Sequence, residues 1–168
     1  MAQTYIHKGS YQSILEDASP GLLFLKALLP ALDSLGPFHG TPDVANYLAP
    51  NAVFIINNGG PVQAASVLGM LEMRASKLSK FGHAVEMVWD VDNADGSRTV
   101  MYESTSVTVF KEDSDGVEVK IKEFNVIELA KSVDGKGLHG LQAIQLKAYL
   151  DGSPVADRAA AMMKARKQ

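Results

Sequence analysis

Four long segments rich in β-branched and aromatic residues occupy the second half of the chain. Short turns rich in glycine, aspartate and asparagine join them. Turns of this kind connect antiparallel neighbours, whereas parallel strands need long crossovers. The pattern therefore predicts an antiparallel meander, and strands this long need one face of their sheet covered. The predicted strands are 83–91, 98–110, 117–130 and 141–149.

The segment before the meander predicts helices. Ser19 is a favourable N-cap and Pro20 suits the first helical position, so the apolar run that follows indicates a helix that ends at Gly36. Pro30 lies inside this run, and we expect a kink or break there because proline has no N–H to donate. Residues 1–19 are mostly polar and are expected to form an irregular arm or lid.

Shorter elements are expected between the first helix and the meander. A threonine-proline-aspartate cap predicts a short helix at 41–47, and the β-branched run 52–57 predicts a strand that ends in a glycine-rich turn. Helical spacing returns at 62–79 and ends at Gly82. After the meander, a serine-proline cap predicts a C-terminal helix at 153–165.

This order of elements defines an α+β fold, because tight turns and not helical crossovers join the strands. We expect a curved antiparallel sheet wrapped around the N-terminal helices, which forms a cone-shaped pocket, with the C-terminal helix added. A chain of 168 residues is long enough for one domain with a sizeable core. The expected organisation is an arm at 1–19 and a single domain at 20–168.

The composition argues against several classes of partner. A net charge of -3 and the lack of a basic run argue against nucleic acid. The absence of cysteine excludes disulfides and thiolate ligands. Lys26 and Pro30 interrupt the longest apolar stretch, and no apolar leader is present, so we expect a cytoplasmic protein with no membrane partner. No paired-histidine spacing or phosphate loop occurs, so neither metal nor cofactor is expected.

The chain resembles the nuclear transport factor two-like superfamily, and within it the SnoaL-like and scytalone dehydratase-like branch. The segments NYLAPNAVFIINNGGPVQAASVL at 46–68 and QLKAYLD at 145–151 carry the resemblance, which covers roughly residues 20–151. It implies a cystatin-like α+β cone. Known members include ketosteroid isomerase and polyketide cyclases, and the convex face of the sheet commonly pairs with a second copy.

The resemblance also implies site residues. His83 looks like the histidine that opens the strand after the long helix in the scytalone dehydratase branch, and Asn125 looks like the asparagine of the third strand. Glu103 and Glu123 stand where that branch has a histidine and a serine. Two carboxylates in these places would alter the protonation chemistry.

A carboxylate in an apolar cone has its charged form disfavoured, which suits it to general acid or base catalysis. We therefore interpret Glu103 and Glu123 as an acid–base pair, His83 as a proton shuttle and Asn125 as a donor to a developing oxyanion. The alternative for each glutamate is an ion pair with a lysine on a solvated face. Residues predicted as pocket wall, although core packing explains them equally well, are Tyr47, Phe54, Met70, Met87, Trp89, Met101 and Thr105.

The sequence hypothesis is a cofactor-independent isomerase, cyclase or dehydratase-like lyase of secondary metabolism. Its substrate would be a small hydrophobic polyketide- or terpenoid-like intermediate. The alternative is a non-catalytic hydrophobic-ligand-binding or protein-interaction module of the same fold. A homodimer is expected through the outer face of the sheet. The apolar residues expected on that face are Val100, Tyr102, Phe124, Val126, Ile144 and Leu146. The C-terminal helix, through Ala159, Met162 and Met163, is the competing cover for that face.

Overall fold

The computed structural model describes residues 3–36 and 44–165 of the chain. Within these ranges the helices are α1 (Pro20–Asp33), α2 (Val67–Lys77) and α3 (Ser153–Ala165). The strands are β1 (Gln3–Lys8), β2 (Leu48–Ile56), β3 (Val62–Gln63), β4 (Leu78–Asp92), β5 (Arg98–Phe110), β6 (Val119–Lys131) and β7 (Leu141–Leu150).

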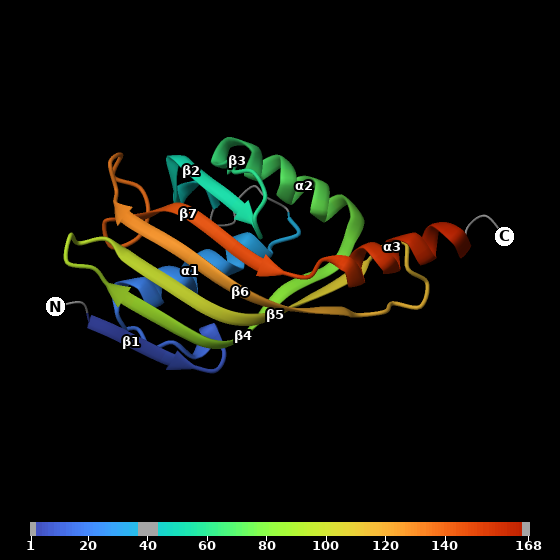
Figure 1. Cartoon of the computed structure of the whole chain (residues 1–168), viewed down its shortest axis with the longest axis horizontal. Coiled ribbons are helices and arrows are strands. Elements are labelled where there is room, and N and C mark those ends of the chain that lie inside the picture. Colours follow the sequence, from blue (N-terminus) through green and yellow to red (C-terminus); the bar gives the residue numbers. More distant parts are fainter. Residues whose placement is uncertain (1–2, 37–43, 166–168) are drawn as a thin grey trace.

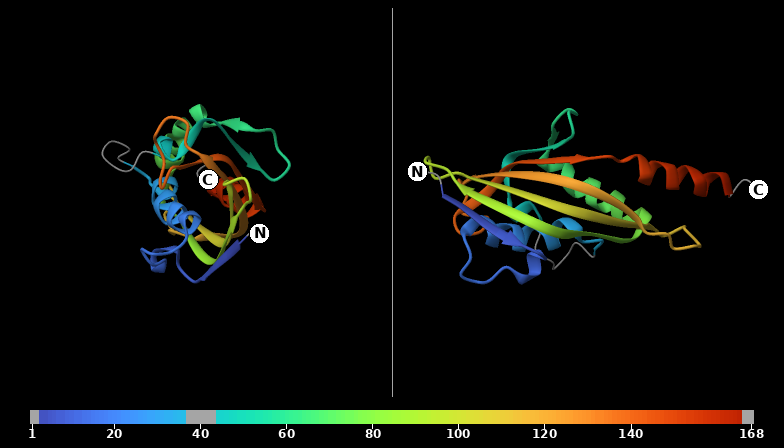
Figure 2. Two further views of the ribbon diagram at one scale, coloured as in Figure 1. Left: turned by 90° about the vertical axis from the view of Figure 1, so that its left-hand side faces the viewer. Right: turned by 60° about the horizontal axis from the view of Figure 1, so that its bottom comes forward.

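All the strands join one sheet in the order β1-β4-β5-β6-β7-β2-β3. The predicted meander is confirmed as β4 to β7, and the α+β fold class is confirmed with it. The sheet is mixed and not wholly antiparallel, because β2 pairs with β7 in parallel. The curved sheet wraps around α1, as the end-on view shows (Figure 1, Figure 2).

Helix α1 supplies much of the hydrophobic core. Phe24, Leu25, Leu28 and Leu29 are fully buried against the concave face of the sheet. Burial of each such side chain stabilises the fold by about 1.5–3 kcal/mol. The helix runs unbroken through Pro30, contrary to the break that the sequence allowed. Pro30 is exposed, so it lies on the solvent side of the helix and away from its buried face.

A buried ion pair attaches the start of α1 to the sheet. Asp90 of β4 is 0% exposed and accepts hydrogen bonds from Arg98 Nε at 2.9 Å and Nη2 at 2.9 Å. Its Oδ2 also accepts from the backbone N–H of Gly21 at 3.0 Å. A Cβ added at Gly21 would overlap the Asp90 carboxylate. Glycine is therefore required where the first turn of the helix meets this carboxylate, which also complements the helix dipole.

Three expectations along the chain are wrong. Residues 3–8 form strand β1, which pairs with β4, and are not an irregular segment. Strand β4 begins at Leu78, so Gly82 lies inside a strand and does not end a helix. Helix α2 begins at Val67 after the short strand β3. Of the short helix expected at 41–47, the first residues lie outside the described ranges, and Val44–Asn46 forms one 3-10 turn.

Helix α3 follows β7 and packs beside the turn between β5 and β6 (Figure 1). Arg158 donates from Nε to Asp113 at 2.8 Å and from Nη2 to Asp115 at 3.3 Å. No described residue of α3 is buried. The helix therefore does not cover the outer face of the sheet, the alternative considered from the sequence. None of the helices in the described residues is long and apolar enough to cross a membrane.

Candidate active site

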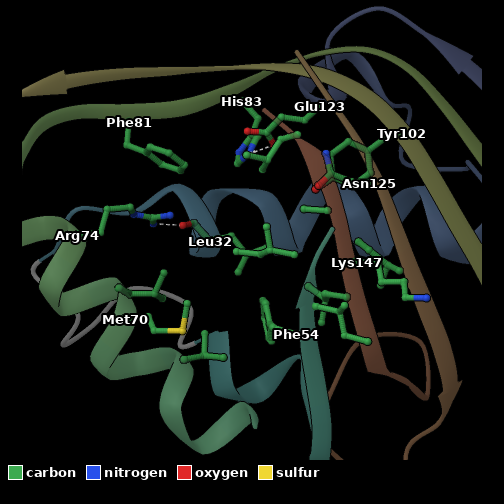
Figure 3. A pocket seen from close by; sticks show the side chains of 18 of the residues that line it. Leu32, Phe54, Met70, Arg74, Phe81, His83, Tyr102, Glu123, Asn125 and Lys147 are labelled. Atoms are coloured by element: carbon green, nitrogen blue, oxygen red, sulfur yellow. Dashed lines mark hydrogen bonds and ion pairs between the residues drawn. The ribbon is translucent and has the colours of Figure 1, made fainter. Parts of the chain in front are cut away.

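A pocket of about 330 Å³ opens between α2, the end of α1 and the concave face of the sheet (Figure 3). This volume suits a small organic ligand. Its wall is mostly apolar, with Leu32, Phe54, Met70, Phe81 and Ile127 among the lining residues. The polar side chains that line it are Arg74, His83, Tyr102, Glu123, Asn125 and Lys147.

His83 is held between two carboxylates. Its Nδ1 lies 2.5 Å from Asp33 Oδ1, and its backbone N–H donates to Asp33 Oδ2 at 2.9 Å. On the opposite side of the ring, Nε2 lies 3.2 Å from Glu123 Oε2. The side chains of Asp33, His83 and Glu123 are 14%, 12% and 7% exposed. Together they form a buried Asp33-His83-Glu123 relay at the pocket wall.

The fold brings these residues together from three elements. Asp33 is the last residue of α1, and His83 lies on β4. Glu123 and Asn125 are two apart on β6 and so share its concave face. On β5 their cross-strand partners are Ser104 and Tyr102, and Asn125 Nδ2 donates to Ser104 Oγ at 3.3 Å.

The relay determines the charge of His83. Burial alone would lower the pKa of the His83 imidazole, but the hydrogen bonds and negative charges of Asp33 and Glu123 outweigh burial and raise it to about 9. His83 is therefore an imidazolium at neutral pH. Both ring N–H groups are then donors, one to each carboxylate.

The pKa values of Glu123 and Tyr102, which lie near His83, are shifted as well. Burial tends to raise the pKa of Glu123, but hydrogen bonds from His83 and Ser106 and the His83 charge outweigh it and lower that pKa. Glu123 is therefore ionised at neutral pH. Burial, with the charges of Asp33 and Glu123, raises the pKa of Tyr102 far above its usual value, so its hydroxyl stays protonated. The pocket thus combines an ionised carboxylate with neutral hydrogen-bond donors.

The structure brings together part of the predicted site. Among the proposed catalytic residues, His83, Glu123 and Asn125 line the pocket, and among the proposed wall residues, Phe54 and Met70 do. Tyr47 instead packs edge-on against Phe24 in the core, with ring centroids 5.8 Å apart.

The structure places the remaining predicted site residues outside the lining of this pocket, namely Glu103, Met87, Trp89, Met101 and Thr105. On β5 both alternating sets of residues mix polar and apolar types, and the set that faces inward contains Val100, Tyr102 and Ser104. On β4 a register shift between Val85 and Met87 reverses the alternation. Met87 and Trp89 therefore pair with Glu103 and Met101 on the outer face.

Sequence reasoning missed Asp33 and two residues that line the pocket. Asp33 holds His83 but is not itself a lining residue, and its role depends on the contact between α1 and β4, for which the sequence holds no local signal. Tyr102 was assigned to the outer face with Val100 and Leu146, and all three are buried on the concave side. Arg74 of α2 was not predicted as a site residue, yet it lines the pocket. Arg74 follows Met70 by four residues, so the two lie on the same face of α2, and this spacing could have identified it.

The comparisons with known proteins show the fold. No family model matches the sequence, and no curated protein matches it. Solved structures do match. A proposed SnoaL-like polyketide cyclase from Jannaschia sp. CCS1 superimposes with a TM-score of 0.59 at 16% identity, over 84% of this chain and 95% of that one. The BvnE pinacolase from Penicillium brevicompactum gives a TM-score of 0.58 at 11% identity, over 90% and 97%.

A third match is ActVI-ORFA from Streptomyces coelicolor, with a TM-score of 0.57 at 18% identity, over 77% of this chain and 93% of that one. These likenesses confirm that the chain has the nuclear transport factor two-like fold that its sequence resembles. Several proteins that share this fold are named as enzymes, among them cyclases and a pinacolase.

The raised pKa of His83 predicts a pH-dependent stability. A group whose pKa rises on folding contributes stability that is complete below its unfolded pKa of 6.5 and is lost as the pH rises through about 9. The loss should be on the order of 3 kcal/mol. Chemical unfolding at pH 6 and pH 9.5 should detect it. The His83→Asn variant should lack this slope, whereas His139→Asn, on an exposed turn, should keep it. Equal slopes in both variants would contradict the assignment.

Proposed function

We propose that the protein is a cofactor-independent enzyme that moves protons on a small hydrophobic carbonyl compound. The reaction would belong to the isomerase, cyclase or lyase class, and the substrate would be polyketide- or terpenoid-like. One observation carries the proposal: an ionised glutamate, Glu123, faces a largely apolar pocket beside a buried imidazolium. The named relatives of this fold, cyclases and a pinacolase, support the substrate class.

Glu123 is the general base in this proposal. Its carboxylate takes a proton from the carbon next to the substrate carbonyl, and the electrons of the C–H bond move to the carbonyl oxygen to form an enolate. Asn125 and Tyr102 line the same wall and offer N–H and O–H donors for that oxygen. The enolate then regains the proton at another carbon, attacks a second carbonyl, or expels a leaving group. These outcomes correspond to isomerase, cyclase and lyase.

His83 acts through Glu123 and is a positioning residue. Its Nε2–H fixes one oxygen of the Glu123 carboxylate, and Asp33 fixes the other side of the ring. When His83 loses its proton at high pH, this restraint on Glu123 weakens. The reaction rate should therefore fall as the pH rises through about 9, and this limb of the pH profile should be absent in His83→Asn.

The test uses a ketone that needs only the first step. 2-Tetralone is a bicyclic ketone with acidic α-protons, and proton removal in D₂O replaces them with deuterium. The wild-type protein should accelerate this replacement over buffer, as measured by mass spectrometry. Binding of 2-tetralone without any acceleration would overturn the proposal. That result would favour the alternative, a hydrophobic-ligand-binding module, which the apolar lining of the pocket also suits.

We further propose a homodimer through the outer face of the sheet. Phe124, Ile144 and Tyr149 there are 36%, 40% and 42% exposed, and Trp89 lies 6.4 Å from Phe124 between ring centroids. Ile6 of β1, 58% exposed, extends this outer apolar patch opposite Trp89. An apolar patch on a sheet face is well suited to a closed two-fold interface with a second copy.

Light scattering should give twice the mass of the chain. Phe124→Arg should reduce that mass to one chain, because a charge in the centre of the outer apolar patch would have to be buried. Val133→Arg, on the turn between β6 and β7, is the control and should leave the mass unchanged. A wild-type mass of one chain would reject the dimer.

A further inference from the structure

Arg74 of α2 extends into the pocket at the end away from Glu123 (Figure 3). Its Nη2 donates to the backbone carbonyl of Leu32 and, at 3.3 Å, to that of Ser34. Its guanidinium lies over the ring of Phe81, 3.9 Å from the ring centroid. A partly buried cation thus lines one end of an apolar pocket, beside an aromatic ring that can stack on it.

Arg74 lacks an anionic partner among the residues that the structure describes. Within those ranges no carboxylate forms an ion pair with it, and its buried Nε has no hydrogen-bond acceptor. Asp33 attracts Arg74 electrostatically, but each oxygen of Asp33 already accepts a hydrogen bond from His83. A buried donor without an acceptor is costly, and a buried charge without a partner more so. The pocket therefore holds a cation that a bound anion would satisfy.

The charges at the two ends of the pocket are complementary to such a ligand. At neutral pH Glu123 supplies a negative charge at its end of the pocket, next to His83, and Lys147 also lines the pocket, whereas α2 supplies the positive charge of Arg74 away from Glu123. A ligand carboxylate would be repelled at the Glu123 end and attracted at the Arg74 end. Because Nη2 is occupied by the two carbonyls, the ligand carboxylate would accept a charge-assisted hydrogen bond from the remaining N–H donors of the guanidinium. Leu32, Met70 and Phe81 would contact the apolar body of the ligand next to it.

We infer that Arg74 forms a carboxylate subsite and that the substrate is a hydrophobic carboxylic acid. This inference rests on the proposed function and refines its substrate class. The carboxylate on Arg74 orients the substrate, so that its reacting carbon lies toward Glu123. Recognition of the carboxylate also selects one direction of binding in a pocket whose other contacts are mostly apolar.

The test compares two matched probes, 2-naphthoate and the uncharged 2-naphthamide, by isothermal titration calorimetry. A charge-assisted hydrogen bond predicts that wild-type protein binds 2-naphthoate about tenfold or more tightly than the amide. Arg74→Met should lose this preference and still bind 2-naphthamide. Lys147→Met removes the lysine that lines the pocket and should keep the preference. Arg74→Lys should keep part of it, because it retains the charge but not the planar set of guanidinium N–H donors.

A second measurement needs no variant that could misfold. The chain has four arginines, so side-chain ¹⁵Nε–¹H signals are few, and the signal of Arg74 should move on binding 2-naphthoate but not on binding 2-naphthamide. Equal affinity for the two probes, a preference that survives Arg74→Met, or a preference lost only in Lys147→Met would overturn the subsite. If 2-naphthamide binds and 2-naphthoate binds no more tightly, the carboxylate subsite is overturned but the proposed function is not. Failure of both probes to bind would contradict the proposed function as well.

Discussion

The Glu123→Gln variant should exchange the α-protons of 2-tetralone about a hundredfold or more slowly than the wild-type protein. The amide has nearly the shape of the carboxylate but cannot accept the proton, so proton removal loses its base. Side-chain volume and packing change little, and the pocket should still bind the ketone. Initial rates of deuterium incorporation, measured by mass spectrometry at pH 7 with saturating ketone, give the comparison.

Glu103→Gln is the matched control for this experiment. Glu103 lies on the neighbouring strand β5, opposite Phe124, with its side chain exposed on the outer face. The substitution removes the same charge from the same sheet without reaching the pocket, so the exchange rate should stay at the wild-type value. Equal losses in the two variants would mean that net charge and not a positioned base controls exchange. An unchanged rate in Glu123→Gln would remove Glu123 from the mechanism.

Asp90→Asn should destabilise the fold by about 3–5 kcal/mol, because it leaves the buried Arg98 without its charge partner. It should also weaken the attachment of α1, since the Asp90 carboxylate accepts the Gly21 N–H. Gly21→Ala tests the same contact from the other side, because the added methyl group would overlap that carboxylate. Urea unfolding at pH 7 measures all these changes as free energies of unfolding.

Asp92→Asn is the control for the buried pair. Asp92 contacts the same arginine, at 3.3 Å from Nη1, but its side chain is 43% exposed. Exposed ion pairs contribute at most about 1 kcal/mol, so this variant should lose little stability. If Asp90→Asn loses no more stability than Asp92→Asn, the contact between Asp90 and α1 does not hold the helix to the sheet as described.

The meander was predictable because its signals are local. Alternating β-branched residues and glycine-rich turns placed β5 at 98–110, which agrees with the structure at both ends. The parts that failed depend on tertiary contacts. Strand β1 is mostly polar, and it forms because it pairs with the edge of β4. The first residues of β4 were assigned to a helix because their sequence pattern fits a helix as well as a strand.

The candidate site was predictable only where the alternation of a strand was unambiguous. On β6 the charged residues Lys120 and Lys122 contrast with Ile121 and Ile127, so Glu123 and Asn125 were correctly given one face. On β5 neither alternating set was clearly apolar, and the wrong set was chosen. On β4 a bulge between Val85 and Met87 reverses which alternate residues face the pocket, and no local sequence pattern indicates this bulge. The role of Asp33 could be assigned only once α1 was packed on the sheet.

The most direct test of the central claim is a crystal structure of the Glu123→Gln variant bound to 2-tetralone. Because this variant lacks the base, the ketone should remain unreacted in the pocket between α2 and the sheet. An α-carbon should lie about 3–3.5 Å from the side-chain oxygen at position 123. The ketone oxygen should lie within hydrogen-bond reach of Asn125 or Tyr102. A ketone bound outside the pocket, or with both α-carbons turned away from position 123, would contradict the proposal that Glu123 removes the proton.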